Sequence, residues 1–326
     1  MPDTCRICGN AQRNQRYLGR EMMFGLREQF PYFQCSRCRC LQIVEPPADM
    51  APFYPPHYYS LQAKLPSPPK PLARLLLRAE SHFRLHVSND IFPPSRKRRI
   101  FDWIRKSGCS YHCTILDVGC GRGKLLHDLH RLGFTRLCGV DPYLPEEPPV
   151  ERGIRILKRE LQQLDERFDL IMMHHTLEHL DTPLECMRQA ADRLNTSGVL
   201  LVRIPLIDKY AWREYGVDWF SLDAPRHLML HSEKSFGILA EQSGLRIERV
   251  VYDSAAHQFW GSEQYRRDIH HRAPNSYEEN PAASIFSRAQ IRDYERRSRQ
   301  LNAQRDGDAA CFYLRRQDHG VSPAPR

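Results

Sequence analysis

The chain has 326 residues, 11 cysteines and a formal net charge of +9, which is enough for one large domain with an appendage or for two domains. It has no charge-free apolar run of about 18 residues and no charged-then-apolar leader, so we expect neither a membrane span nor a secretory signal. We therefore expect a cytoplasmic location. The charge is uneven. Residues 61–110 hold 11 Lys/Arg against 3 Asp/Glu, whereas residues 111–261 hold 18 against 22. A core without a basic excess makes nucleic acid an unlikely substrate.

Two C-x-x-C pairs stand near the N-terminus, Cys5 with Cys8 and Cys35 with Cys38, separated by 26 residues. Each pair can place two thiolates on one side of a tight turn, and the two pairs complete a tetrahedral site typical of zinc. Cys40 is a substitute ligand, but Cys38 keeps the spacing. Four thiolates leave no open position, so the pattern predicts a structural zinc ion in a ribbon over residues 1–45. The alternative is unconnected thiols in a reducing cytosol.

Residues 46–95 are predicted to connect this ribbon to the rest of the chain. Prolines exclude a helix over residues 46–56, and the aromatic residues that follow predict a strap lying across another surface. Residues 72–87 then have the pattern of an amphipathic helix with arginines on its polar side. Its predicted apolar stripe is Leu72, Leu75, Leu76 and Phe83, beside Arg74, Arg78 and Arg84. This helix either packs on the core or docks on an anionic membrane surface or a lipid-linked substrate.

From residue 96 onward the sequence predicts a doubly wound α/β domain. Residues 114–126 contain an apolar run that ends in an acid, a glycine-dense turn and an apolar-periodic helix, and such units bind ligands at the carboxyl end of the strand. Apolar runs then alternate with helical patterns. The predicted strands are 114–117, 137–141, 153–157, 168–173, 198–205, 245–252 and 309–314. The predicted helices are 95–106, 123–132, one opening at 181–183, 232–243 and one near 285–301.

Three kinds of nucleotide-binding loop compete for the glycine-rich turn. A P-loop needs a glycine five residues before Gly123 and Ser or Thr after the lysine, but Val118 and Leu125 stand there. A dinucleotide fingerprint needs Gly or Ala three residues after Gly121, where the chain has Lys124. What remains is the pattern Asp-x-Gly-x-Gly-x-Gly, followed 20 residues after Gly121 by an acid that ends the second strand.

That pattern resembles the signature of class I S-adenosylmethionine (SAM) methyltransferases. The resemblance implies that glycines let the backbone approach SAM, that the first acid orients its amino-acid end, and that the second binds ribose hydroxyls. It also implies an acidic or polar residue near the adenine after strand three, where Glu160 and Leu161 stand, and a strand-four loop that faces the cofactor. The implied cofactor-binding residues are Asp117, Gly119, Gly121, Asp141, Glu160, Leu161 and His174.

Residues 1–316 are similar to a subgroup of this family that carries an N-terminal cysteine ribbon. The subgroup includes deoxysugar C-methyltransferases and relatives from polysaccharide or secondary-metabolite pathways. The resemblance implies a seven-stranded Rossmann-like sheet whose last strand enters antiparallel between strands five and six. It places the methyltransferase domain at residues 96–316, with insertions after strands five and six, and leaves residues 317–326 as a loose tail.

Methyl transfer from a sulfonium requires a positioned nucleophile and, where that nucleophile is protonated, a group that takes its proton. The loop after strand four supplies His179, which is either catalytic or structural. The aromatic stretch 210–231 after strand five is predicted to be a substrate lid. Within it, His227 is suited to general base catalysis, or is a hydrogen-bonded packing residue. Arg226 pairs either with a substrate phosphate or carboxylate or with Asp223.

The sequence therefore favours a SAM-dependent methyltransferase that acts on a small-molecule or glycan-linked acceptor, at oxygen or carbon. One alternative is an RNA or protein methyltransferase that uses the ribbon for recognition. The acidic core argues against it, as does the lack of an amino-methylation motif after strand four. The other alternative is a non-catalytic SAM-binding module, against which the intact glycine-loop pattern and its two strand-end acids argue.

Overall fold

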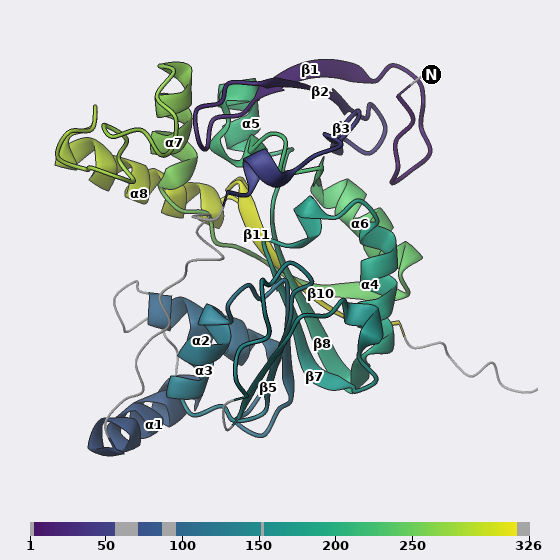
Figure 1. Ribbon diagram of the computed structural model, residues 1–326, viewed down its shortest axis with the longest axis vertical. Helices are drawn as coiled ribbons and strands as arrows, with labels where there is room; N and C mark the ends of the chain where they lie inside the picture. The colour runs from purple at the N-terminus through teal and green to yellow at the C-terminus, as the bar shows by residue number, and fades with distance from the viewer. Residues whose placement is uncertain (1–2, 56–70, 87–95, 151–152, 318–326) are drawn as a thin grey trace, which may run out of the picture.

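A computed structural model of the chain describes residues 3–55, 71–86, 96–150 and 153–317. Two sheets organise these residues (Figure 1). The larger sheet has seven strands with helices on both faces. The smaller sheet has four strands and lies at the top of the view in Figure 1, close to the later helices of the chain.

The seven-stranded sheet has the order β10-β11-β8-β7-β4-β5-β6. Neighbouring strands from β6 to β8 are parallel, and β11 is antiparallel to both β8 and β10. This confirms the predicted doubly wound Rossmann-like sheet and its antiparallel last strand. The strands are β4 (Ile115–Val118), β5 (Leu137–Val140), β6 (Ile154–Leu157), β7 (Phe168–His174), β8 (Leu194–Pro205), β10 (Leu245–Tyr252) and β11 (Ala309–Arg316).

Two hydrophobic layers form the core, one on each face of this sheet. Alternate strand residues point to opposite faces, so Ile115 and Leu170 enter one layer while Leu116 and Ile171 enter the other. The first layer lies under the helices near β5 in Figure 1, and the second under those beside β10. The covering helices are α1 (Pro71–His86), α2 (Arg96–Ser107) and α3 (Lys124–Arg131) on one side, and α4 (Pro183–Asp192) and α6 (Glu233–Gln242) on the other.

Helix α1 covers most of the predicted amphipathic helix. Leu76 and Phe83, predicted to form its apolar stripe, are exposed. Arg84, predicted on the solvated side, is buried instead, donates to Glu80 at 2.8 Å and lies 5.9 Å from the ring centroid of Phe101. Most of the other stripe side chains, and the predicted strap beyond residue 55, lie outside the described residues.

The smaller sheet joins the N-terminal region to a segment far along the chain. Its strands are β1 (Gln15–Arg20), β2 (Gln29–Gln34), β3 (Leu41–Ile43) and β9 (Met229–Leu230), and all neighbours are antiparallel. Strand β9 comes from the region between β8 and α6. Residues 15–43 of the predicted ribbon therefore share a sheet with residues 229–230 of the predicted lid. The domain boundaries stay a prediction.

The predicted lid is largely a packed aromatic layer. It contains α5 (Tyr210–Tyr215), and it packs on α7 (His257–Arg266) and α8 (Arg288–Ala303), which belong to the insertion before β11. Trp219 is fully buried, its ring centroid lies 6.3 Å from that of Trp212, and its indole N–H donates to Asp308 at 2.9 Å. These two aromatic side chains thus stabilise the lid itself. Among the described residues, no helix is both long and apolar enough to cross a membrane.

Candidate functional site

The turn between β4 and α3 requires glycine at three positions. Gly119, Gly121 and Gly123 have φ values of 71°, 52° and 77°, in the left-handed region that L side chains rarely adopt. At Gly119 there is a second reason, because a Cβ atom would lie 2.7 Å from the side chain of Thr176, on the loop after β7. The glycine pattern therefore lets the two loops come together at the carboxyl edge of the sheet.

Asp141, directly after β5, ties this turn to the neighbouring strand end. One carboxylate oxygen accepts the N–H of Gly121 at 2.9 Å, and the other accepts the N–H of Tyr143 at 2.9 Å. The N–H of Gly119 donates to the carbonyl of Val140 at 2.8 Å. A carboxylate can accept about four hydrogen bonds, so Asp141 can still accept hydrogen bonds from the hydroxyl groups of a ligand.

Asp117 lies on the same edge but is buried, with 4% of its surface exposed. Burial, together with the nearby charge of Asp141, raises the pKa of Asp117 to about 8. The carboxyl group is therefore largely protonated at neutral pH. A cation placed against it would favour the ionised form.

The remaining predicted cofactor residues have varied surroundings. Glu160 is exposed, and its side chain accepts a backbone N–H in a reciprocal capping box with Gln163. Leu161 is buried in the hydrophobic layer beside α4. His174 ends β7, and its ring centroid lies 4.2 Å from that of Trp103 in α2. A role for these residues in cofactor binding stays a prediction.

A buried charged network runs along the ends of β7, β8 and β10. His175 Nδ1 lies 3.0 Å from Glu178 Oε1, and its Nε2 contacts the guanidinium of Arg203. Arg203 also donates to Asp253 at 2.7 Å. Sequence reasoning missed Arg203 and Asp253. The available signal was one arginine inside the otherwise apolar run 199–204 of β8.

His227 is buried and oriented by a backbone carbonyl. Its Nδ1 lies 2.8 Å from the carbonyl oxygen of Ser221, so that nitrogen is the donor, and in the neutral ring Nε2 carries the lone pair. Nε2 lies 4.0 Å from Glu178 Oε1 and 3.9 Å from Asp223 Oδ2. A proton taken up at Nε2 would therefore lie between two carboxylates.

His179 is held in a similar way. Its Nδ1 lies 2.9 Å from the carbonyl oxygen of Arg226 and 3.2 Å from the hydroxyl of Tyr54. Its ring centroid is 4.7 Å from that of His227, so the structure brings the two predicted catalytic histidines together. Burial and His227 lower the pKa of His179 to about 4. The ring is therefore neutral at physiological pH.

Glu178 lies fully buried beside both rings. Burial alone would raise the pKa of Glu178, but the hydrogen bond to His175 and the two neighbouring histidines hold it at about 2. The side chain is thus a buried carboxylate. One donor atom from each of Glu178, His179 and His227 lies within 4.8 Å of the others.

Arg226 is not a surface cation. It is fully buried, donates to Asp223 at 2.6 and 3.0 Å, and donates to Glu21 at 3.0 Å. The predicted salt bridge to Asp223 is therefore present. The alternative, pairing with a substrate phosphate or carboxylate, is wrong for this structure because the guanidinium is already enclosed.

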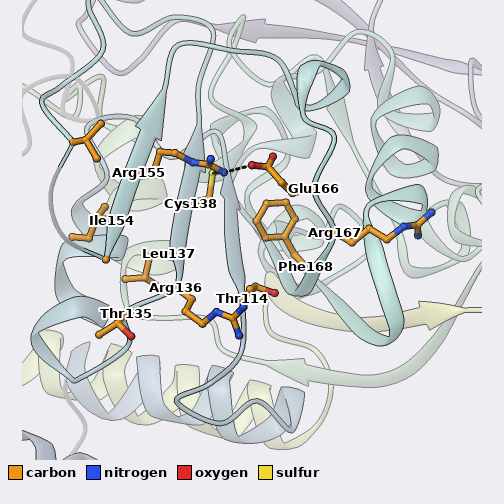
Figure 2. A pocket seen from close by; sticks show the side chains of 12 residues that line it. Thr114, Thr135, Arg136, Leu137, Cys138, Ile154, Arg155, Glu166, Arg167 and Phe168 are labelled. Carbon is orange, nitrogen blue, oxygen red and sulfur yellow. Dashed lines mark hydrogen bonds and ion pairs between the residues drawn. The ribbon is translucent and has the colours of Figure 1, made fainter.

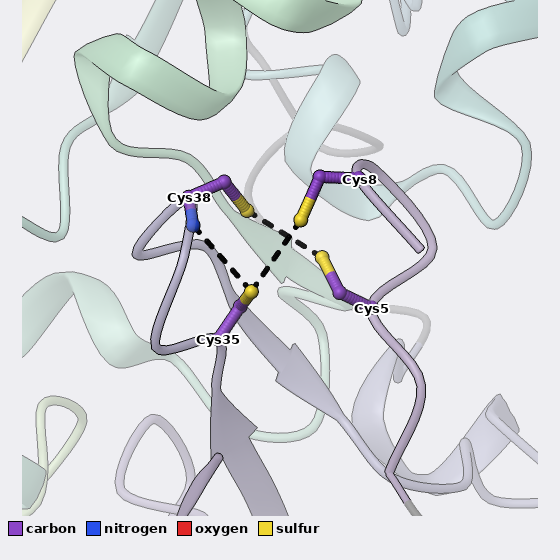
Figure 3. Close-up of side chains that lie close together, drawn as sticks. All are labelled: Cys5, Cys8, Cys35 and Cys38. Carbon is purple, nitrogen blue, oxygen red and sulfur yellow. Dashed lines mark hydrogen bonds between the residues drawn. The ribbon is translucent and has the colours of Figure 1, made fainter. Parts of the chain in front are cut away.

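The four predicted metal ligands converge (Figure 3). The Sγ atoms of Cys5 and Cys38 are 3.5 Å apart, as are those of Cys8 and Cys35. Four thiolates at the usual Zn–S length of about 2.3 Å would be about 3.8 Å apart at the corners of a tetrahedron, so the donor set fits zinc. Cys40 is buried outside this group, with its Sγ near the carbonyl of Leu41.

A groove of about 340 Å³ lies at the amino ends of the strands of the large sheet (Figure 2). Its lining includes Thr114, Arg136 and Phe168, which stand where β4, β5 and β7 begin. Arg155 of β6 crosses it and pairs with Glu166. Ligands of doubly wound sheets bind at the carboxyl ends of the strands, so this groove is separate from the candidate site.

Comparison with known proteins gives the family. Residues 83–250, just over half of the chain, match the methyltransferase domain family. The chain is 33% identical to the ubiquinone biosynthesis O-methyltransferase of Azorhizobium caulinodans over 98 residues, which are 27% of this chain and 38% of that protein. It is 29% identical to the tRNA U34 carboxymethyltransferase of Shewanella loihica over 106 residues, 29% of this chain and 32% of that protein. The chain thus spans about a third of the length of these relatives.

A solved SAM-dependent methyltransferase from Archaeoglobus fulgidus is similar over 72% of this chain and 96% of its own, with 18% identity and a TM-score of 0.43. A TM-score of that size does not by itself show a shared fold. The assignment depends on the match over residues 83–250, in which the glycine turn, both strand-end acids and the paired histidines all lie. On that match, the chain belongs to the methyltransferase domain family.

Proposed function

We propose that the protein is a SAM-dependent methyltransferase that methylates oxygen or carbon of a small-molecule or glycan-linked acceptor. One observation carries the proposal. The glycine turn and Asp141 are hydrogen-bonded together at the carboxyl edge of the family's sheet, and the loop after β7 contacts this turn through Thr176. That same loop continues into Glu178 and His179, beside His227.

In this proposal the cofactor lies against the turn at Gly119 and Gly121, with its ribose hydroxyls on Asp141. When bound, SAM supplies the activated methyl group. The amino-acid end of the cofactor lies toward Asp117, whose carboxyl group can ionise against a cation. The proposal also includes cofactor contacts by Glu160, Leu161 and His174.

His227 is the proposed general base, with His179 beside it. Both rings have Nδ1 at hydrogen-bond distance from a backbone carbonyl, so in the neutral ring Nε2 carries the lone pair and can accept a proton from an acceptor hydroxyl or an acidic C–H. The carboxylate of Glu178, 4.0 Å from His227, would stabilise the imidazolium that forms. This arrangement suits an acceptor that must lose a proton as it is methylated.

The acceptor class is tested by incubating the protein with labelled SAM and a panel of nucleotide-sugars, lipids and RNA. Label in a sugar or another small acceptor supports the proposal and the sugar-methyltransferase resemblance. Label in RNA supports the alternative, in which the N-terminal region recognises nucleic acid. One relative is named as a tRNA carboxymethyltransferase, so the charge of the core is a weaker argument against RNA than the sequence suggested.

We also propose that Cys5, Cys8, Cys35 and Cys38 hold one structural zinc ion. The positions of the four sulfur atoms support this, and so does a side-chain hydrogen bond to one of them. The side-chain amide of Gln42 donates to the Sγ of Cys5 at 2.9 Å. Hydrogen bonds of this kind orient metal-bound thiolates.

Membrane docking through α1 remains a prediction, supported by the exposure of Leu76 and Phe83.

Replacing Asp141 with alanine should weaken SAM binding by about 1–3 kcal/mol, the usual cost of losing a charge-assisted hydrogen-bonding partner. The variant loses the proposed ribose contacts and the acceptor that holds the N–H of Gly121. Isothermal titration with SAM measures the change. Asp165→Ala, which removes an exposed carboxylate, is the matched control and should bind SAM normally. Equal affinity in the two variants would contradict the assignment of Asp141.

SAM affinity should rise with pH because of Asp117. Its pKa of about 8 in the free protein lies above the ordinary value of 3.8, so the group is protonated below pH 8. Pairing with the cationic end of SAM favours the ionised form, and binding therefore releases a proton. One released proton gives about a tenfold rise in affinity per pH unit between about pH 6 and 8.

Titration calorimetry at several pH values, in buffers of different ionisation enthalpy, measures both the affinity and the released proton. Asp117→Asn cannot ionise, so its affinity should lack this rise. Any remaining pH dependence in the variant belongs to the amino group of SAM or to other residues. A wild-type affinity that is flat from pH 6 to 8 would show that Asp117 does not ionise on binding.

A further inference from the structure

The segment that carries His227 is hydrogen-bonded to the N-terminal region at consecutive residues. The hydroxyl of Tyr32 in β2 donates to the carbonyl of His227 at 2.9 Å. The N–H of Ile43 in β3 donates to the carbonyl of Leu228 at 3.0 Å. Pairing of β3 with β9 continues this contact over the next two residues. The N–H of Leu228 also donates to the carbonyl of Glu178, on the loop after β7, at 2.8 Å. The backbone around His227 is therefore held from both the N-terminal region and the seven-stranded sheet.

A buried ionic group holds the preceding residue, Arg226. Its guanidinium bridges Asp223 and the fully buried carboxylate of Glu21, which follows β1. Glu21 is itself held, because its oxygens accept the N–H groups of Met23, Phe24 and Leu26 at 3.0–3.2 Å. Burying such charges is costly, and replacing them with apolar groups is often neutral or stabilising. A role in positioning gives a reason for their presence.

The ionic group acts on both histidines. The carbonyl of Arg226 accepts Nδ1–H of His179, and Asp223 Oδ2 lies 3.9 Å from Nε2 of His227. If Arg226 moved, His179 would lose the carbonyl that accepts its Nδ1–H and keep only the hydroxyl of Tyr54, at 3.2 Å. His227 would keep the carbonyl of Ser221 but would lose one of its two neighbouring carboxylates. The Nδ1–H tautomer of His179 and the electrostatic surroundings of His227 thus depend on the position of this one arginine.

We propose that Glu21 is a positioning residue of the acceptor site, which acts through Arg226 to hold the tautomer of His179 and the position of the Asp223 carboxylate beside His227. The N-terminal region is then one structural half of this site rather than a separate recognition module. The inference rests on the proposed role of the two histidines in methyl transfer. Glu21 itself contacts neither of them through any hydrogen bond or ion pair among the described residues.

The test determines which ring nitrogens of His179 and His227 carry protons, in full-length protein loaded with zinc and SAM. Glu21→Gln removes the charge and keeps the shape, and Glu28→Gln removes an exposed charge from the same region as the control. Long-range ¹H–¹⁵N spectra of ¹⁵N-histidine-labelled protein show which ring nitrogen carries the proton. Signals of His179 and His227 are assigned by His→Gln substitution.

Wild type and Glu28→Gln should show Nδ1–H at both rings. Glu21→Gln should lose it at His179 and shift the ring signals of His227, while SAM affinity and zinc content stay unchanged. With the acceptor found by the panel, kcat should fall by up to about 10²-fold, the loss expected from a base misplaced by about 1 Å. Wild-type ring signals in Glu21→Gln would overturn the proposal.

Tyr32→Phe serves if Glu21→Gln does not fold, because it removes one hydroxyl from the carbonyl of His227. Shifted ring signals of His227 support the positioning role of the N-terminal region, and unchanged signals overturn it. The ring protons are observed without catalysis. A failure of His227 as the base would therefore leave this result standing, and the two proposals can fail separately.

Discussion

Replacing Cys35 with serine is expected to remove the zinc ion and to unfold the N-terminal sheet. Cys5 and Cys8 precede β1, and Cys35 and Cys38 lie in the turn between β2 and β3, so the metal joins segments that no strand pairing holds together. Its binding free energy should therefore contribute much of the folding free energy of this region. In zinc-finger peptides a structural zinc ion contributes about 10–16 kcal/mol. The loss should extend to the acceptor site, because the contacts of Glu21, Tyr32 and Ile43 with residues 226–228 depend on this sheet.

Metal analysis of protein purified without added zinc gives the stoichiometry, which should be one per chain for wild type and none for Cys35→Ser. Cys40→Ser is the matched control, because Cys40 is buried nearby but lies outside the four-sulfur group. It should retain one zinc ion. Proteolysis and thermal unfolding report the N-terminal sheet separately from SAM binding. A folded, reduced wild-type protein without metal would rule out the zinc proposal.

Replacing His227 with glutamine should lower kcat for methyl transfer by about 10²–10⁴-fold, the usual contribution of a general base. Glutamine can still donate to the carbonyl of Ser221, but it has no lone pair of comparable basicity at the position of Nε2. SAM affinity should be unchanged, because the described hydrogen bonds and ion pairs of His227 involve other segments and not the glycine turn. The effect therefore belongs to the chemical step.

Single-turnover transfer of labelled methyl to the acceptor found by the panel measures this change, with calorimetry for SAM. His112→Gln, at an exposed position before β4, is the matched control. The same assay on His179→Gln compares the two rings. An unchanged kcat in His227→Gln, with a large loss in His179→Gln, would move the base to His179. Normal rates in both would remove the histidines from the chemistry.

The seven-stranded fold could be predicted from the sequence because its signals are local. Apolar runs, strand-end acids and capped helices recur along residues 96–316, and the observed strands agree with the predicted ranges to within a few residues. The glycine turn was equally readable. Gly119, Gly121 and Gly123 stand where the backbone adopts positive φ, a conformation that glycine marks in any sequence. Strand order followed from the resemblance to the family.

Long-range charge pairing was not readable in this way. The partners Glu21 and Arg226 are 205 positions apart, and nothing in the sequence near either one indicates the other. Sequence reasoning therefore left Arg226 open to a substrate, whereas burial encloses it between two carboxylates. The same holds for Arg203 and Asp253, which meet only because β8 and β10 flank β11 in the sheet.

By itself, then, the sequence determined the fold class, the glycine turn and the grouping of the four cysteines, because residue type and short spacing decide those features. Only the tertiary structure decided that β9 would join the N-terminal sheet and that His179, His227 and Glu178 would meet. Those contacts arise from packing between segments distant in the chain. Their free energies depend on burial and on partners that no local pattern specifies.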